Sequence, residues 1–294
     1  MSAFDVITDR IISQLEAGTA PWRRPWGGRF RFPRNLTSGK TYRGVNVFLL
    51  SMAGYSSPCW LTYKQAQALG GSVRKGEHGM PVVFWTEWKR EQADGTTDKI
   101  PVLRYYTAFN MAQCDGLPPD RIGADDVLPA HPFAPIACCE SVVADMPNRP
   151  DVQHGFDSAC YVPAADAVRM PNQSAFDKPE GYYATLFHEL GHATGHASRL
   201  DRKGITDRAP FGTDTYGREE LVAEMTSAFL CGHSGIETAV LENSAAYVAG
   251  WLRVIQQDAR LVVTAAAQAQ KATDYILGRT WGDQSADAVE GGAL

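Results

Sequence analysis

The sequence lacks features that would place it in several large classes of protein. None of its six cysteines stands in a CxxC pair, and a disulfide framework is not expected in a chain this long without a secretion signal. No window approaches 18 uninterrupted apolar residues, and the N-terminus carries Asp5 and Asp9 where a signal peptide needs an apolar run. We therefore expect a cytoplasmic protein with reduced cysteines and no membrane partner.

Acidic residues are scarce in the first third of the chain and abundant afterwards. Residues 1–90 contain 13 lysines and arginines against 5 acids, a net charge of +8, whereas residues 91–294 contain 15 against 28, a net charge of −13. A length of 294 residues suits two domains. The asymmetry predicts a basic and an acidic part that face different partners.

The spacing of apolar residues predicts an α+β fold. Residues 4–15 carry apolar side chains at helical intervals, as an amphipathic helix packing on the N-terminal domain would. Residues 46–54 and 62–71 are typical of short helices, and residues 79–110 alternate like an antiparallel hairpin. The first domain is thus expected to be small, with an antiparallel sheet.

A stretch rich in Pro, Gly and Asp, residues 113–133, predicts a linker. The domain boundaries expected from it are 1–128 and 136–294. The second domain should be mainly helical, with two short strands joined by a turn and then four helices. These elements are expected at 158–170 for the strands, and at 180–192, from 218 onward, and twice within 242–278 for the helices.

The segment FHELGHATGH contains the motif HExxH, formed by His188, Glu189 and His192. Residues four apart share one face of a helix, so both imidazoles can reach one ion while Glu189 lies beside them. Two neutral imidazoles suit Zn²⁺, and the carboxylate can accept the proton of an attacking water. The motif predicts a zinc peptidase centre with Glu189 as its catalytic base, although Mn²⁺ or another divalent ion also fits such ligands.

A third ligand is needed, and the long form of the motif does not supply it. That form requires a histidine where the chain has Ser198. His196 follows His192 by four residues, but three successive turns of a straight helix span about 10.8 Å and cannot converge on one ion. The remaining option is a carboxylate from the next helix, where Glu220 and Glu224 lie one turn apart.

The stretch Trp22 to Arg43 contains seven basic residues, five aromatic residues and no acid. Its prolines and glycines make it too irregular to enter a groove of duplex DNA as a helix or ribbon. Basic side chains along a backbone, with aromatic rings stacked on unpaired bases, characterise single-strand binding. We therefore expect it to bind single-stranded DNA, with a second basic pair continuing the site. The predicted residues are Trp22, Arg23, Arg24, Trp26, Arg29, Phe30, Arg31, Phe32, Arg34, Lys40, Tyr42, Arg43, Arg74 and Lys75.

These segments carry a family resemblance. NLTSGKTYRGVN, WLTYKQAQALGGSVRKGEHG and VVFW resemble the N-terminal single-stranded-DNA-binding domain of ArdC-type antirestriction proteins, which TraC-type plasmid primases share. EGYYATLFHELGHATGHASRLDR with REELVAEMTSAFLCG is similar to their zincin-like metallopeptidase domain. The resemblance implies a plasmid protein that binds incoming single-stranded DNA in conjugation and shields it from host restriction.

The zincin resemblance also implies roles for the two glutamates. In the ExxA[D/E] string of glutamate-type zincins the first carboxylate binds the metal and the later one braces a ligand histidine. By this resemblance Glu220 binds the metal and Glu224 braces a ligand histidine. In the alternative assignment Glu224 is the metal ligand. The peptidase substrate would be a protein, with a host restriction component as a candidate. The alternative is a DNA-binding protein whose metal domain is structural or regulatory.

Overall fold

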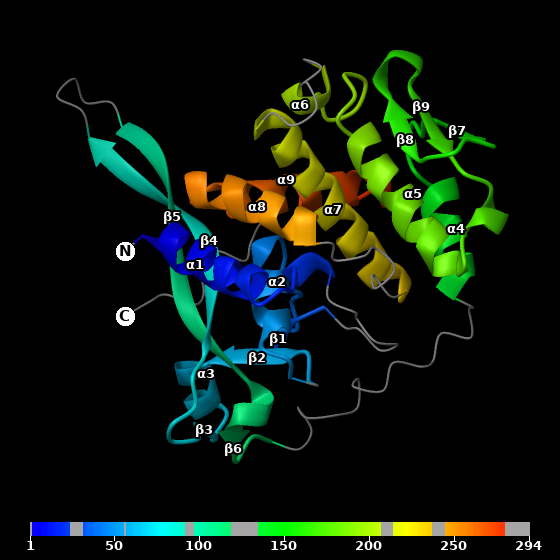
Figure 1. Cartoon of the computed structure of the whole chain (residues 1–294). Coiled ribbons are helices and arrows are strands. Elements are labelled where there is room, and N and C mark those ends of the chain that lie inside the picture. Colours follow the sequence, from blue (N-terminus) through cyan, green and yellow to red (C-terminus); the bar gives the residue numbers. More distant parts are fainter. Residues whose placement is uncertain are drawn as a thin grey trace. The chain divides into compact units, whose positions relative to one another are not determined.

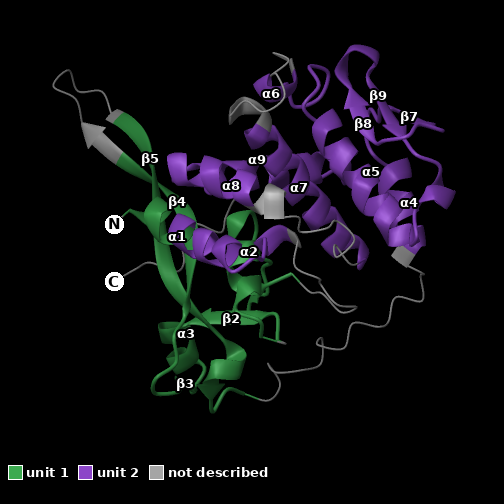
Figure 2. Cartoon of the chain, in the orientation of Figure 1, with its two compact units in different colours: residues 1–7, 32–128, 281–294 green, residues 8–31, 129–280 purple. Residues whose placement is uncertain are grey.

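The structure, a computed structural model, describes residues 2–23, 32–55, 57–91, 97–118, 135–206, 214–236 and 245–279. The chain divides into two compact units (Figure 2). Unit 1 comprises residues 1–7, 32–128 and 281–294, and unit 2 comprises residues 8–31 and 129–280. Both units contain helices and strands, which confirms the predicted α+β fold with two domains. None of the helices within the described ranges is long and apolar enough to span a membrane.

Unit 1 is built on a four-stranded sheet of order β1-β2-β5-β4 (Figure 1). The strands are β1 (Arg34–Asn35), β2 (Cys59–Thr62), β4 (Met80–Glu91) and β5 (Thr97–Asn110). The predicted hairpin is confirmed, because all of β4 pairs antiparallel with β5, from Met80 opposite Ala108 to Glu91 opposite Thr97. Strand β2 pairs with β5 only over Ala108–Asn110, so the rest of β4 and β5 forms a two-stranded ribbon.

A small apolar core fixes helix α2 (Val45–Met52) to this sheet. Leu50 of the helix is buried against Trp60, Val82 and Ala108 of three strands. The helix also closes the edge of the sheet, because the Asn46 side chain exchanges two hydrogen bonds of 2.8 Å with the backbone of Val83 on β4. An amide side chain thus replaces the neighbouring strand that an edge lacks.

Helix α3 (Tyr63–Ala68) begins with a capping box formed by Thr62 and Gln65. Beside it lies a second, two-stranded sheet of β3 (Ser72–Val73) and β6 (Cys114–Asp115). The predicted linker at residues 113–133 therefore begins too early, since β6 belongs to unit 1. Short strands of two residues leave no alternating pattern from which the sequence could reveal them.

Unit 2 combines helices with a three-stranded sheet of order β7-β9-β8 (Figure 1). The predicted pair of strands is confirmed as β8 (Cys160–Val162) and β9 (Ala167–Met170), which are antiparallel. Strand β7 (Asp151–His154) lies parallel to β9 and was not predicted. The helices are α4 (Pro135–Ala144), α5 (Pro179–Ala193), α6 (Lys203–Thr206), α7 (Asp214–Ser234), α8 (Ala245–Gln257) and α9 (Leu261–Ile276).

The predicted N-terminal helix exists as α1 (Ala3–Glu16), but its packing differs from the expectation. Ile7, Ile11 and Leu15 are buried as the spacing indicates. From Thr8 onward, however, the helix groups with unit 2, where the Thr8 hydroxyl donates a 2.7 Å hydrogen bond to the carbonyl of Ala259. The helical period identifies a buried face, but it carries no information about which core covers that face.

Candidate metal centre

Helix α5 presents the HExxH motif from a buried position. Pro179 occupies its first turn, where no backbone N–H is lost, and Phe187 and Leu190 anchor it in the core. The four-residue spacing places the imidazoles of His188 and His192 side by side, with 3.1 Å between their Nε2 atoms. Glu189 is 8 % exposed.

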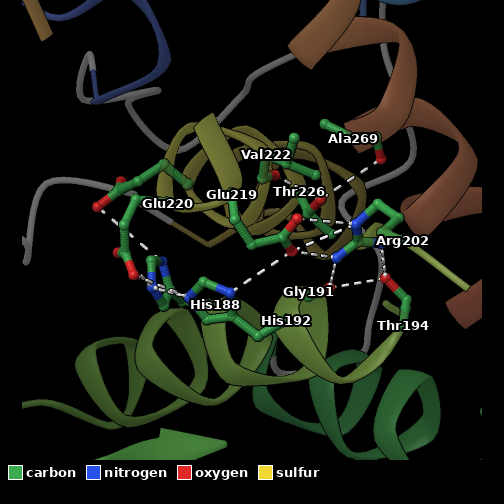
Figure 3. A network of polar contacts seen from close by, with 11 residues as sticks. His188, Gly191, His192, Thr194, Arg202, Glu219, Glu220, Val222, Thr226 and Ala269 are labelled. Carbon is green, nitrogen blue, oxygen red and sulfur yellow. Dashed lines mark hydrogen bonds and ion pairs between the residues drawn. The ribbon is translucent and has the colours of Figure 1, made fainter. Parts of the chain in front are cut away.

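Helix α7 brings the third side chain to the same point (Figure 3). The carboxylate of Glu220 lies 3.5 Å from Nε2 of His188 and 3.4 Å from Nε2 of His192. The two distances involve different oxygens, Oε2 for His188 and Oε1 for His192. With one ligand atom taken from each residue, the three atoms lie within 4.8 Å of one another, so a small adjustment would bring them to the separation of about 3.3 Å that a tetrahedral ion with bonds of about 2.0 Å requires. Within the described ranges, His188, His192 and Glu220 form the group that could hold a metal.

A glycine in the motif allows the two helices to approach so closely. A Cβ atom on Gly191 would lie 3.2 Å from Cα of Ala223 and 3.2 Å from Cβ of Thr226, both on α7. This contact between small residues sets the separation of α5 and α7, and at this separation the Glu220 carboxylate can reach both imidazoles. Gly191 therefore belongs to the construction of the centre although it offers no ligand.

Two further glutamates of α7 face the outer nitrogens of the imidazoles. Glu224 Oε1 lies 3.9 Å from Nδ1 of His188, and Glu219 Oε1 lies 3.6 Å from Nδ1 of His192. Both Nδ1 atoms are buried and make no hydrogen bond. Sequence reasoning considered Glu224 but missed Glu219, whose only signal is that it directly precedes the expected ligand.

The carboxylates make the centre strongly favourable for positive charge. Burial opposes a charge on His192, but Glu219 and Glu220 outweigh this effect and raise the pKa of its imidazole to about 10. Burial would raise the pKa of Glu220, but the two imidazoles hold it below its usual value. A divalent cation satisfies the same demand, since it attracts the carboxylate and leaves both imidazoles neutral. The donor set therefore fits a divalent ion.

The third histidine of the segment does not join the ligands. Helix α5 ends at Ala193, and His196 lies in the following turn, where its Nδ1 is 2.8 Å from the hydroxyl of Ser198. This position agrees with the expectation that a straight helix cannot converge three turns on one ion.

Among the predicted DNA-binding residues, Trp22 is a core residue. It is 1 % exposed, and its ring packs edge to face against Trp251 at 5.3 Å. A buried indole offers no face to a base, so the prediction for Trp22 is wrong. The sequence around Trp22 has no helical or strand periodicity from which its burial could be predicted. The residues Arg24, Trp26, Arg29, Phe30 and Arg31, and the side chain of Arg23, lie outside the described part of the chain.

The other predicted residues are in unit 1 with mixed surroundings. Arg34 donates to Sγ of Cys59, and the half-buried Tyr42 hydroxyl accepts from the amide of Asn35. Arg74 is exposed but pairs with Glu77 and Asp115 at 2.8 and 3.4 Å. Phe32 and Arg43 are half-buried, whereas Lys40 and Lys75 are exposed. The DNA-binding roles of these residues stay predictions.

Exposed aromatic rings lie on the long hairpin of unit 1. On the ribbon of β4 and β5, Trp85 is 46 %, Trp88 54 % and Tyr105 48 % exposed. The register pairs Val83 with Tyr105 and Trp85 with Leu103, so the Trp85 and Tyr105 side chains are diagonal neighbours on one face. Trp88 lies on the opposite face, because it is three residues from Trp85 along β4. Exposed rings on two adjacent strands are unusual for a protein surface, and the pair of Trp85 and Tyr105 on one face indicates a binding face. We refer to Trp85, Trp88 and Tyr105 as the aromatic ribbon.

Comparison with known families matches both units. A family described as the N-terminal domain of anti-restriction factor ArdC matches residues 2–109, and a family described as zincin-like metallopeptidase matches residues 140–268. The DNA primase TraC of Escherichia coli is 38 % identical over 296 residues, which cover 92 % of this chain and 26 % of the primase. The chain therefore spans about a quarter of the length of that relative. The protein y4eC of Sinorhizobium fredii is 38 % identical over 289 residues, covering 93 % of this chain and 91 % of the relative.

Two solved structures have the same fold. The metal-free structure of antirestriction ArdC protein from the R388 plasmid shares 39 % identity with a TM-score of 0.76, covering 94 % of this chain and 97 % of that one. The Mn(II)-bound structure of the same protein shares 37 % identity with a TM-score of 0.74, covering 97 % and 100 %.

Proposed function

Because the chain belongs to the family of ArdC antirestriction proteins, we propose that it is a metal-dependent peptidase that also binds single-stranded DNA. Its role would be to protect incoming plasmid DNA from restriction in the recipient cell. The observation that supports a peptidase is that His188, His192 and Glu220 lie together, with 3.1 Å between the two Nε2 atoms and 3.4 to 3.5 Å from each of them to the Glu220 carboxylate. Glu189 follows His188 directly and is close enough to affect the pKa of His192.

The ligand chemistry favours zinc as the resident ion. Two imidazoles and one carboxylate form the ligand set of many catalytic zinc sites, which keep a fourth position open. A bound divalent ion would polarise the substrate carbonyl and make the attacking water more acidic. Mn²⁺ remains an alternative occupant, in keeping with the Mn(II)-bound structure of the R388 protein.

Glu189 is the residue that would move the proton. It is nearly buried on α5 directly after His188, and its carboxylate is one of the charges that raise the pKa of His192, so it lies near the ligands that would hold the ion. It would accept a proton from the attacking water and deliver it to the nitrogen of the departing amine. His188, His192 and Glu220 would hold the ion and take no part in proton transfer.

Binding of single-stranded DNA is assigned to unit 1. Its support is the aromatic ribbon together with the family match over residues 2–109. Stacking on Trp85 and Tyr105 tolerates any base, because every base has a π-face. Arg104 is exposed on the opposite face of the ribbon, where it pairs in register with Phe84, and would contact a phosphate.

One substitution tests the proposed chemistry. Glu189→Gln should keep metal and single-stranded DNA binding while abolishing cleavage of a host restriction component incubated with the protein and a divalent ion. A variant with unchanged metal-dependent cleavage would exclude Glu189 as the base. If protection against restriction in a conjugation assay survives Glu189→Gln, the metal domain has a structural or regulatory role instead.

A further inference from the structure

Arg202 lies buried between the end of α5 and the start of α7. It follows the turn after α5 and is 8 % exposed. Its Nε donates to both carboxylate oxygens of Glu219 at 3.1 and 3.2 Å, Nη1 donates to the hydroxyl of Thr194 at 2.6 Å, and Nη2 donates to the carbonyl of Gly191 at 2.8 Å. Figure 3 shows this network continuing directly into the metal centre.

Two glycines leave the space that this arrangement needs. A Cβ atom on Gly195 would lie 3.1 Å from Nη2 of Arg202, and a Cβ atom on Gly204 would lie 3.1 Å from Oε2 of Glu219. The backbone at Gly195 therefore packs against the guanidinium of Arg202, and the backbone at Gly204 packs against the carboxylate of Glu219. The Glu219 side chain is held in one place by contacts on several sides.

The fixed carboxylate faces the one nitrogen of His192 that a metal would leave protonated. A neutral imidazole that binds an ion through Nε2 carries its proton on Nδ1, and this proton needs an acceptor. Nδ1 of His192 is buried and makes no hydrogen bond, and Glu219 Oε1 lies 3.6 Å away. A small inward movement of the ring on metal binding would complete the hydrogen bond.

We propose that Glu219, held by Arg202, is a positioning residue that orients His192 for metal binding. Glu224 occupies the equivalent place beside Nδ1 of His188 at 3.9 Å. Each ligand histidine would then have its own carboxylate brace on α7, and the brace of His192 is itself fixed by Arg202. The inference concerns the metal affinity of the centre and holds whether or not the bound ion cleaves peptides.

The competing explanation is that Arg202 and Glu219 only fasten α7 to the end of α5. Both explanations predict that removing one partner destabilises the protein, because the other charge is then buried alone. They differ when both partners are replaced. A neutral pair of similar size, Glu219→Gln with Arg202→Met, avoids the lone charge but supplies no carboxylate to His192. In the wild-type chain the Thr194 hydroxyl also donates to the carbonyl of Gly191 at 2.6 Å, so this carbonyl is not left without a donor when Arg202 is replaced.

The experiment measures Zn²⁺ affinity by competition with a chromophoric chelator, alongside thermal unfolding of the metal-free protein. We expect the dissociation constant to rise by about 10- to 100-fold in Glu219→Gln, the usual effect of losing an outer carboxylate. In the double variant the melting temperature of the metal-free protein should recover towards wild type while the affinity stays low. Visible spectra of the Co²⁺-loaded variants should show an altered ligand geometry.

A matched control removes a neighbouring charge that has no contact with the centre. Arg218→Gln breaks the surface ion pair with Asp258, 2.9 Å long, one residue before Glu219 on α7, and should leave the Zn²⁺ affinity unchanged. A double variant that is stable and binds Zn²⁺ within about twofold of wild type overturns the proposal. Wild-type affinity in a folded Glu219→Gln variant does the same.

Discussion

Glu220 and Glu224 are both candidates for the third ligand by sequence, and the structure predicts different consequences for their removal. The Glu220 carboxylate reaches Nε2 of both His188 and His192, whereas Glu224 approaches only Nδ1 of His188. Glu220→Ala should therefore remove a ligand from the ion. Glu224→Ala should leave all three ligands in place and loosen the orientation of one of them.

The magnitude follows from linkage between binding and folding. At a free metal concentration of 100 times the dissociation constant, a bound ion stabilises the native state by about 2.7 kcal/mol. For a unit of this size the melting temperature should rise by about 5–11 °C, at roughly 2–4 °C per kcal/mol. A 10- to 100-fold weaker site leaves about 0.4–1.4 kcal/mol at the same metal concentration, which corresponds to about 1–6 °C.

The assay is thermal unfolding of each variant with and without Zn²⁺, so that the difference reports metal binding separately from the intrinsic effect of the substitution. We expect almost no metal-induced rise for Glu220→Ala and a reduced but measurable rise for Glu224→Ala. A full wild-type rise in Glu220→Ala would refute the assignment of Glu220 as a ligand. If only Glu224→Ala abolished the rise, the roles of the two glutamates would have to be exchanged.

Further expected outcomes concern the ribbon, the helix contact and a pair of charges. Trp85→Ala should weaken single-stranded DNA binding by about 1–3 kcal/mol with an unchanged salt slope, whereas Arg104→Gln should lower the slope of log K against log salt by about 0.7; fluorescence titrations at several salt concentrations measure both. Gly191→Ala should lower Zn²⁺ affinity in chelator competition, because the methyl group would push α7 away from α5. Burial opposes the charge of Asp166, but the ion pair with Arg199 holds the pKa of Asp166 in the folded protein below its usual range. The ion pair therefore stabilises the folded state at pH values above about 3.9, the pKa of an unfolded aspartate, and this stabilisation is lost as the pH falls through the lower pKa of the folded protein. The stability difference between wild type and Asp166→Asn, followed by denaturant unfolding, should shrink as the medium becomes more acidic.

Features that depend on local sequence could be predicted well. The pair His188 and His192 shares a helix face because the helical period is fixed by the backbone, and the structure places both imidazoles side by side. The hairpin of β4 and β5 was likewise visible from alternation within one continuous stretch. The position of Glu220 beside the two imidazoles could be predicted only from the resemblance to zincins, since Glu220 lies 28 residues after His192.

Features that depend on packing between distant segments could not be predicted. Trp22 lies in a basic, irregular stretch, and its burial depends on Trp251, which is more than 200 residues away. The same limit applies to α1, whose buried face was correctly identified but whose core was not. The sequence showed Glu219 and Glu220 as adjacent acids, but a helical step of about 100° between them decides which nitrogen each one faces.

Along α5 and α7 the contacting residues run in opposite order, and this explains why each of the three glutamates on α7 contacts a different part of the two imidazoles. His188, nearer the start of α5, faces Glu224, which is further along α7, whereas His192 faces Glu219. Glu220 lies between these contacts and reaches Nε2 of both rings. One helix thus surrounds two imidazoles with an inner carboxylate and two outer ones, and the ligand geometry depends on a single interface between α5 and α7. Any change that shifts α7 along α5 must alter all three contacts together. Arg202 binds both the end of α5 and Glu219 of α7, so it is well placed to fix the position of α7 along α5.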